Sequence, residues 1–365
     1  MKTPLSPKQA ICLILLFLID SSSVEDGSHI ARQDVWLCAI FAFWAALPFI
    51  LLYSNLFSLY PGLSFFEIAQ KTLGKHLGAF VNICYILFFL HTTSLVVQHF
   101  THFINENALP RTPAAALALP ICLLAAWMAS LGVYKFSRGA VILAFIFGVS
   151  FLVTLPLSLM HVDWGNLFPL LTSPPQVILS ETFSLFASPM TQAAIFLFLF
   201  DHMADAKKIR KSYVRGTALV AAFISLNLLR AIIAFGGEAM GTLHFRTFST
   251  ASILHINGFV YRMEILFSGI FVIGVLVKMV VFFYISYRGV NLFFPKMKAI
   301  YVYPSFVVIV FILCLLRLPN SAHLFEWTNI FRWYALPFQV FIPLLVWIVA
   351  KAQARRLNTQ KKHLL

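Results

Sequence analysis

Long apolar runs, separated by short polar stretches, recur along the whole chain. Residues 141–159 and 302–316, for example, contain no charged side chain and are apolar on every side. A helix that crosses a bilayer needs about 20 mostly apolar residues. A strand of an outer-membrane barrel instead alternates in polarity over about ten residues. The pattern therefore predicts an all-α polytopic membrane protein and excludes a β-barrel.

The composition agrees with this class of protein. Hydrophobic residues make up 60% of the 365 residues and charged residues only 11%, whereas about 25% of an ordinary soluble chain is charged. A water-soluble globule is thereby excluded. We expect ten spans, the first and sixth of them interrupted, near residues 10–30, 35–55, 79–104, 114–132, 139–160, 180–200, 214–236, 262–286, 302–318 and 333–350.

The distribution of Lys and Arg orients these ten spans. Nineteen of the 27 Lys and Arg residues fall in the termini and loops of one side, here called the basic side, and six fall on the other. Short cytoplasmic loops collect positive charge, so we expect the basic side and both termini to be cytoplasmic. Topology also explains the net charge of +14 better than a nucleic-acid partner does, because the basic residues do not share one polar face.

A short amphipathic segment follows the second span. Between Leu63 and Gly78, apolar and polar residues alternate at helical spacing, and the segment is too polar to cross a bilayer. Such a helix is typical of the membrane interface. We expect it to lie on the cytoplasmic surface.

The two interrupted spans carry the main functional signal. In the first, the apolar run ends at Ile19 and is followed by Asp20, Ser21, Ser22 and Ser23; in the sixth, the interruption comprises Ala187, Ser188, Pro189, Met190, Thr191 and Gln192. Proline removes a backbone hydrogen bond, and the carbonyl that it frees is tolerated at membrane depth where it lines a cavity. Breaks at corresponding positions of two five-helix halves indicate an inverted-repeat transporter with a midplane site, although an ordinary proline kink remains the alternative.

A set of short motifs runs along nearly the entire chain. They are Ser6-Pro7-Lys8-Gln9, Gln33-Asp34-Val35-Trp36-Leu37, Tyr60-Pro61-Gly62, Phe66-Glu67-Ile68, Leu109-Pro110-Arg111-Thr112-Pro113, Ser188-Pro189, Asp205 with Lys207 and Lys208, Arg262-Met263-Glu264, Val277-Lys278, Leu336-Pro337-Phe338 and Ala350-Lys351. In this order and spacing the chain resembles the B subunits of bacterial spore germinant receptors (GerAB-type), in the amino acid–polyamine–organocation superfamily.

The resemblance implies a leucine-transporter-like fold with a 5+5 inverted repeat. The chain would be a single integral membrane domain over 1–365, with repeat one at about 10–160, repeat two at about 180–350 and a cytoplasmic basic tail at 351–365. It also implies recognition of a small germinant, such as an amino acid or a related amine, in the inner membrane of the spore, with A-type and C-type receptor subunits as partners. The alternative function is a stand-alone proton- or sodium-coupled amino acid permease of the same fold.

The chain departs from the family pattern at both breaks. Family members are usually glycine-rich and apolar where this chain has Asp20 to Ser23, and often acidic where Gln192 stands. These departures bear on the identity of the germinant and on any proton coupling through the sixth span.

The expected ligand site lies between the two breaks. Exposed amides of the first break could hold a carboxylate, and carbonyls freed near Ser188 and Pro189 could hold an ammonium group. Asp20 favours a cationic ligand, or lies at the external mouth without touching one. Tyr85 and Thr92, two turns apart on the third span, are further candidates for lining the site. The 39 Phe residues are interpreted as packing and lipid-facing residues rather than a ligand cage.

Charged residues inside spans are candidates for coupling or gating. Arg230, Glu264 and Lys278 should face the interior of the bundle or a wet cavity. Lys278 is either a buried cation or extends to the cytoplasm along its aliphatic stem. Glu264 with Arg262 could form an external gate, or simply be solvated at the start of a helix.

No catalytic motif is present in the sequence, and we expect neither enzymatic activity nor a cofactor. His99 and His102 are spaced as helical metal ligands would be, but only Glu106 lies within local reach, so a metal site is not expected. Asp201, His202 and Asp205 precede a basic stretch and are interpreted as helix-capping residues.

Overall fold

The computed structural model describes residues 5–24, 31–158, 163–203, 205–237, 264–316 and 330–363, and all regular structure within these ranges is helical. The α-helices are α1 (Pro7–Val24), α2 (Val35–Leu59), α3 (Phe65–Leu73), α4 (Lys75–Asn107), α5 (Ala114–Ser130), α6 (Val133–Ser158), α7 (Pro175–Ala187), α8 (Ala206–Phe235), α10 (Glu264–Phe293), α11 (Ala299–Leu315) and α13 (Ile342–His363). The 3₁₀ helices are η1 (Arg32–Asp34), η2 (Trp164–Leu167), η3 (Met190–Phe198) and η4 (Phe200–His202), and η6 (Pro337–Phe341) is a π-helical turn.

Each of the ten predicted spans overlaps helical residues. Six helices within the described ranges are long and apolar enough to cross a membrane, and Pro7–Ile19, Ala114–Ser130 and Ala299–Leu315 are shorter apolar helices. The chain is therefore an all-helical integral membrane protein.

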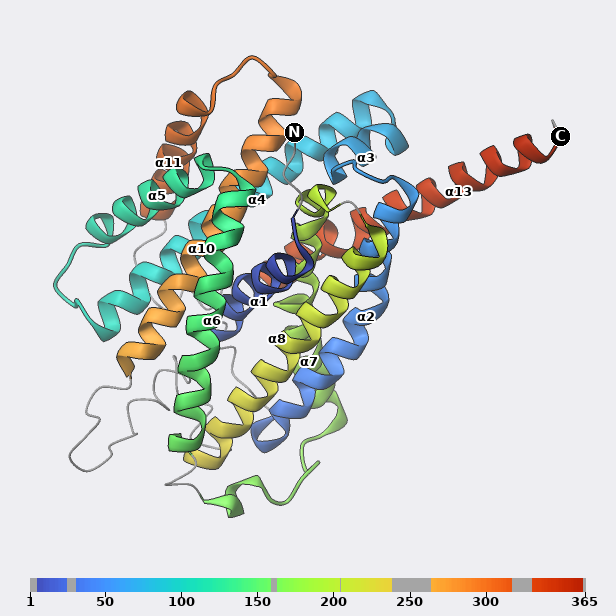
Figure 1. Ribbon diagram of the computed structural model, residues 1–365. Coiled ribbons are helices and arrows are strands. Elements are labelled where there is room, and N and C mark those ends of the chain that lie inside the picture. Colours follow the sequence, from blue (N-terminus) through green and yellow to red (C-terminus); the bar gives the residue numbers. More distant parts are fainter. Residues whose placement is uncertain are drawn as a thin grey trace.

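Helix α1 lies at the centre of the bundle, against α6, α8 and α10 (Figure 1). The close approach of α1 to α8 depends on Gly216, because a Cβ there would lie 2.8 Å from Cδ1 of Ile14. Six of the seven residues from Leu13 to Ile19 are 3% exposed or less, and Leu15 is the exception. The first spanning segment is thus surrounded by protein rather than by lipid.

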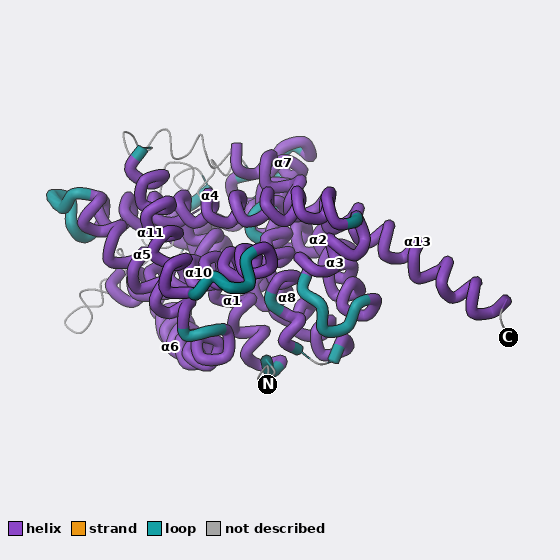
Figure 2. The backbone as a smooth tube through the Cα atoms, turned by 90° about the horizontal axis from the view of Figure 1, so that it is seen from above, coloured by secondary structure: helices purple, strands orange, loops and turns teal. Residues whose placement is uncertain are grey.

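Helix α13 extends well beyond the bundle at the carboxyl-terminal end (Figure 2). Its first half packs against α2 and α3. There the amide of Gln353 donates to the Thr72 carbonyl at 3.1 Å, and the Tyr60 hydroxyl donates to Oε1 of Gln353 at 3.1 Å. The predicted basic tail therefore begins as a continuation of this helix.

The predicted amphipathic helix is confirmed as α3, but its environment differs from the prediction. A capping box of Ser64 and Glu67 starts the helix, with the Ser64 backbone N–H donating to the Glu67 carboxylate at 2.8 Å. Phe65 and Phe66 are buried and pack edge-on against Phe198 of η3, at ring-centroid distances of 5.1 and 4.6 Å. The apolar face of α3 is therefore covered by the bundle rather than by lipid.

Candidate functional site

The predicted break in the sixth span is present. Helix α7 ends at Ala187, Ser188 is extended with φ −152° and ψ 123°, and Pro189 follows it. The chain then continues as the nine-residue 3₁₀ helix η3. Because 3₁₀ helices longer than three or four residues are uncommon and often mark a strained or functional segment, this stretch is structurally unusual. All nine side chains of η3 are buried.

Polar side chains at this break contact one another and the last spanning segment. The amide of Gln192 donates to Oγ of Ser188 at 2.6 Å. Oγ1 of Thr191 lies 2.8 Å from Oε1 of Gln339 and 3.1 Å from the carbonyl of Ala187. A hydroxyl has one proton, so Thr191 donates to one of these oxygens at a time. The break is therefore linked to Gln339 of η6.

A second backbone irregularity, the π turn η6, lies opposite the break. A π turn leaves the ordinary helical hydrogen-bond pattern, and two buried tyrosines supply donors to its carbonyls. The hydroxyl of Tyr53 on α2 donates to the Gln339 carbonyl and that of Tyr85 on α4 to the Phe338 carbonyl, both at 2.6 Å. Two otherwise costly buried carbonyls are thus satisfied at membrane depth.

A small cavity lies between the 3₁₀ segment and the π turn. It has a volume of about 20 Å³, which is room for about one water molecule. Its lining residues come from α1, α4, η3, α10 and the last spanning segment: Phe17, Tyr85, Phe88, Phe89, Thr92, Gln192, Ala194, Ile195, Phe198, Phe282, Phe331, Phe338 and Gln339. A mostly apolar lining with a few polar groups is typical of ligand sites, although such sites are usually hundreds of Å³ in volume.

The structure brings together three of the residues predicted to bind ligand, because Tyr85, Thr92 and Gln192 all line this cavity. Ser188 reaches it through Gln192, while Ala187 and Pro189 supply the broken backbone beside it. Gln339 also lines the cavity and was not among the predicted residues. The interpretation of the Phe residues as packing rather than a ligand cage stays a prediction. Phenylalanines make up seven of the thirteen lining residues, and no signal in the sequence separates them from the other Phe residues.

The predicted interruption of the first span after Ile19 is wrong. Helix α1 continues through Asp20, Ser21, Ser22 and Ser23 to Val24, so their backbone amides are within a helix rather than exposed at a break. Serine and aspartate are weak helix formers, yet they continue the helix that begins at Pro7. The four side chains lie outside the described part of the structure.

Lys278 is buried in α10, next to the cavity. Its side chain is 3% exposed, and Nζ lies 5.4 Å from the ring centre of Phe17, a cavity residue. The alternative in which Lys278 extends to the cytoplasm is therefore wrong. Arg230 is also buried as expected, at 2% exposed. Glu264 is the first residue of α10, its side chain is not described, and Arg262 lies outside the described residues.

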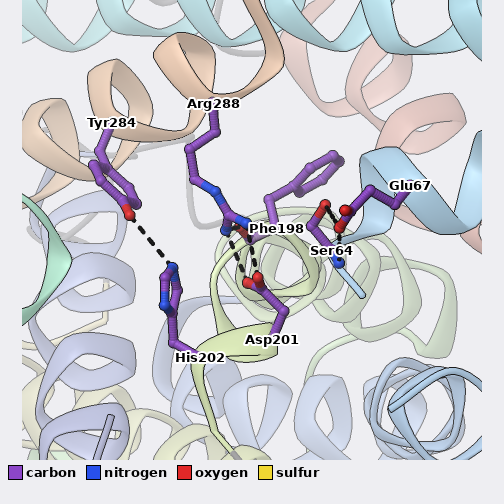
Figure 3. A network of polar contacts seen from close by, with 7 residues as sticks. All are labelled: Ser64, Glu67, Phe198, Asp201, His202, Tyr284 and Arg288. Carbon is purple, nitrogen blue, oxygen red and sulfur yellow. Dashed lines mark hydrogen bonds and ion pairs between the residues drawn. The ribbon is translucent and has the colours of Figure 1, made fainter. Parts of the chain in front are cut away.

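A network of polar contacts lies around Phe198, at the end of η3 (Figure 3). The Arg288 guanidinium donates to both carboxylate oxygens of Asp201, at 2.8 and 2.7 Å, and to the Phe198 carbonyl at 2.7 Å. Beside it, the hydroxyl of Tyr284 lies 3.3 Å from Nε2 of His202. Arg288 lies within α10, beyond the end of the predicted span 262–286.

Phe198 joins this network to the cavity. Its ring lines the cavity and packs against the rings of Tyr85 and Phe89, at centroid distances of 4.9 and 5.0 Å. Its backbone carbonyl accepts a hydrogen bond from Arg288. Phe198 thus contacts the cavity with its side chain and the Arg288–Asp201 pair with its backbone carbonyl.

The predicted capping role holds for Asp205 and is wrong for Asp201. The Asp205 carboxylate accepts from the backbone N–H groups of Lys207 and Lys208, at 2.8 and 3.4 Å, and so caps α8. Asp201 is paired with Arg288 instead, and the Asp201 side chain is completely buried. The 87 residues between these partners conceal the pairing from local sequence patterns.

Comparison with known proteins gives consistent results. Residues 4–322 match the family model described as "Spore germination protein". Relatives in Bacillus subtilis (strain 168) include Spore germination protein KB, 24% identical over 99% of this chain and 98% of its own, and Spore germination protein YndE, 22% identical over 95% and 96%.

Among solved structures, a Na⁺-coupled sialic acid symporter in a substrate-bound outward-open state aligns with 96% of this chain and 75% of its own. The TM-score is 0.47 and the identity 12%. The family match covers most of the chain, and the resemblance deduced from the motifs is confirmed. The chain belongs to the spore germination protein family.

Proposed function

We propose that this chain is the membrane subunit of a spore nutrient germinant receptor, and that it binds a small germinant, an amino acid or a related amine, in the cavity between α4, η3 and η6. The observation that carries the proposal is the meeting of two backbone irregularities, a 3₁₀ segment and a π turn, around one enclosed cavity. Irregular backbone at membrane depth is expected where it lines a site.

The lining suits a small ligand with an apolar part. The phenylalanine rings offer apolar contact, while the amides of Gln192 and Gln339 and the hydroxyl of Thr92 offer hydrogen bonds. Lys278, behind the Phe17 ring, supplies positive charge close enough to favour a carboxylate. Ser188, Pro189 and Ala187 contribute the broken backbone.

Ligand binding requires the cavity to expand. Even the smallest amino acid is several times larger than the single water that about 20 Å³ accommodates. A ligand therefore has to displace aromatic side chains. Among the aromatic residues of the lining, Phe198 accepts a hydrogen bond from Arg288, which is paired with Asp201. Binding of the ligand would in this way favour a conformation in which the basic side is rearranged. A ligand can signal only if it binds one conformation better than the other.

We further propose the architecture and setting that this role entails. The chain is one membrane domain with a leucine-transporter-like 5+5 repeat, in the inner membrane of the spore, with both termini cytoplasmic. A-type and C-type receptor subunits are its partners. Lys278, and Arg262 with Glu264 on the other side, are the residues proposed for coupling and gating.

Deletion and complementation in the source organism test the proposal. Spores that lack the gene should lose the response to at least one nutrient, and the intact gene should restore it. Normal responses to every nutrient in spores that also lack the paralogous genes would refute it. Uptake of the same labelled nutrient by vesicles that contain only this purified chain, driven by a proton or sodium gradient, would favour the stand-alone permease instead.

A further inference from the structure

A large groove opens on the surface of the bundle, away from the central cavity. It has a volume of about 510 Å³ and lies between the second half of α2, the start of α8 and α13. The α2 helix packs along α8 and against α13 (Figure 1). Several groove residues, among them Pro48, Asn55 and Ser58, are exposed, so the groove is accessible from outside.

The groove changes from apolar to basic along its length. Its apolar lining consists of Pro48, Phe49, Leu51, Leu52, Ala206, Leu344 and Trp347, and its polar lining of Ser54, Asn55, Ser58, Lys207 and Arg210. Among the residues that the structure describes, no acidic side chain lines it. The nearest acid along the chain is Asp205, whose carboxylate accepts from the N–H groups that start α8.

The position of the groove matches the edge of a bilayer. Helix α2 ends and α8 begins on the basic side, so Lys207 and Arg210 lie where headgroups would be and the apolar lining lies deeper. Trp347 sits between these zones, as interfacial tryptophans do. Its indole N–H donates to Oδ1 of Asn55 at 2.9 Å, and Lys351 lies 4.6 Å from its ring centre. The tryptophan is thereby held as one wall of the groove.

We propose that this groove binds one phospholipid with an anionic headgroup. An acyl chain lies along Leu52 and Leu344, and the phosphate is held by Lys207 and Arg210. Charge complementarity selects this occupant, because basic pockets between spanning helices on the cytoplasmic side favour anionic headgroups. The lipid would join α2, α8 and α13 at the base of the spanning bundle.

The test uses the purified full-length chain in detergent and fluorescent phosphatidylglycerol as the probe. The Lys207→Gln/Arg210→Gln variant removes both groove cations, and Lys208→Gln/Lys211→Gln is the control, with the same charge change at exposed positions outside the groove lining. The loss of two basic groups near the headgroup should weaken binding roughly 25-fold. The control should lose clearly less affinity, because Lys208 and Lys211 do not line the groove and their exposed charges act on the headgroup only through screening solvent.

Three further measurements complete the test. Ser58→Trp, at an exposed position, should fill the groove and reduce phosphatidylglycerol binding without any change in charge. Phosphatidylcholine with the same acyl chains should bind more weakly, and glycerol phosphate should not compete. Equal losses in both charge variants, undiminished binding to Ser58→Trp, equal binding of phosphatidylcholine, or competition by glycerol phosphate would each overturn the proposal.

Discussion

The ion pair between Asp201 and Arg288 should stabilise the folded protein to a measurable degree. The Asp201 side chain is completely buried and that of Arg288 is 17% exposed. Removal of one partner of a buried pair costs about 3–5 kcal/mol, because the other charge is left uncompensated. Since Arg288 is partly exposed, we expect Arg288→Met to lower the free energy of unfolding by about 3 kcal/mol. Lys296→Met, at an exposed position beyond α10, is the control and should change it by less than about 0.5 kcal/mol.

A double-mutant cycle separates the pair from general effects of substitution. Asp201→Asn keeps the shape of the side chain and should cost about 1–3 kcal/mol. In the double variant the two losses should not add, and we expect a coupling energy of at least about 1 kcal/mol. The assay is reversible unfolding of the purified full-length protein in mixed detergent micelles. Additivity within about 0.5 kcal/mol would refute the claim that this contact joins η4 to α10.

Two further predictions concern the cavity. Tyr85→Phe leaves the Phe338 carbonyl without the hydroxyl that donates to it at 2.6 Å. The substitution should lower the free energy of unfolding by about 1–3 kcal/mol. It should also raise the germinant concentration needed for half-maximal spore germination. Tyr303→Phe, which loses a bond to Ala129 far from the cavity lining, should affect stability alone, and equal germination shifts would contradict this account. Spores that carry Lys278→Met should not germinate in response to nutrient, although the protein stays in the membrane. Spores that carry the exposed control Lys298→Met should respond normally. A normal response with Lys278→Met would refute the coupling role of Lys278.

Sequence patterns predict local features of this protein well. Helical spans follow from the apolar runs, the break at Ser188 and Pro189 from the missing backbone N–H of proline, and α3 from the helical spacing of apolar residues between Leu63 and Gly78. Tyr85 and Thr92 could be chosen together because residues seven apart share a helix face. These features depend on neighbours along the chain, which a single sequence contains.

Features that depend on distant contacts could not be predicted. The pairing of Asp201 with Arg288 and the tyrosine bonds to η6 join residues far apart in the sequence. The continuation of α1 through Asp20 to Val24 runs against the weak helix propensity of serine and aspartate, which was the basis of the predicted break. Phe198 could not be chosen from 39 Phe residues, because its role comes from the cavity on one side and Arg288 on the other.

Selective filling of the cavity tests the central claim most directly. Thr92 is 4% exposed and lines the cavity, whereas Leu87, on the same helix, is 61% exposed on the outer surface. Spores that carry Thr92→Trp or Leu87→Trp at matched levels in the membrane would be compared for germination over a range of nutrient concentrations. We predict that Thr92→Trp abolishes the response or shifts it at least tenfold, while Leu87→Trp germinates like the wild type. A wild-type response in Thr92→Trp spores would contradict germinant binding in this cavity.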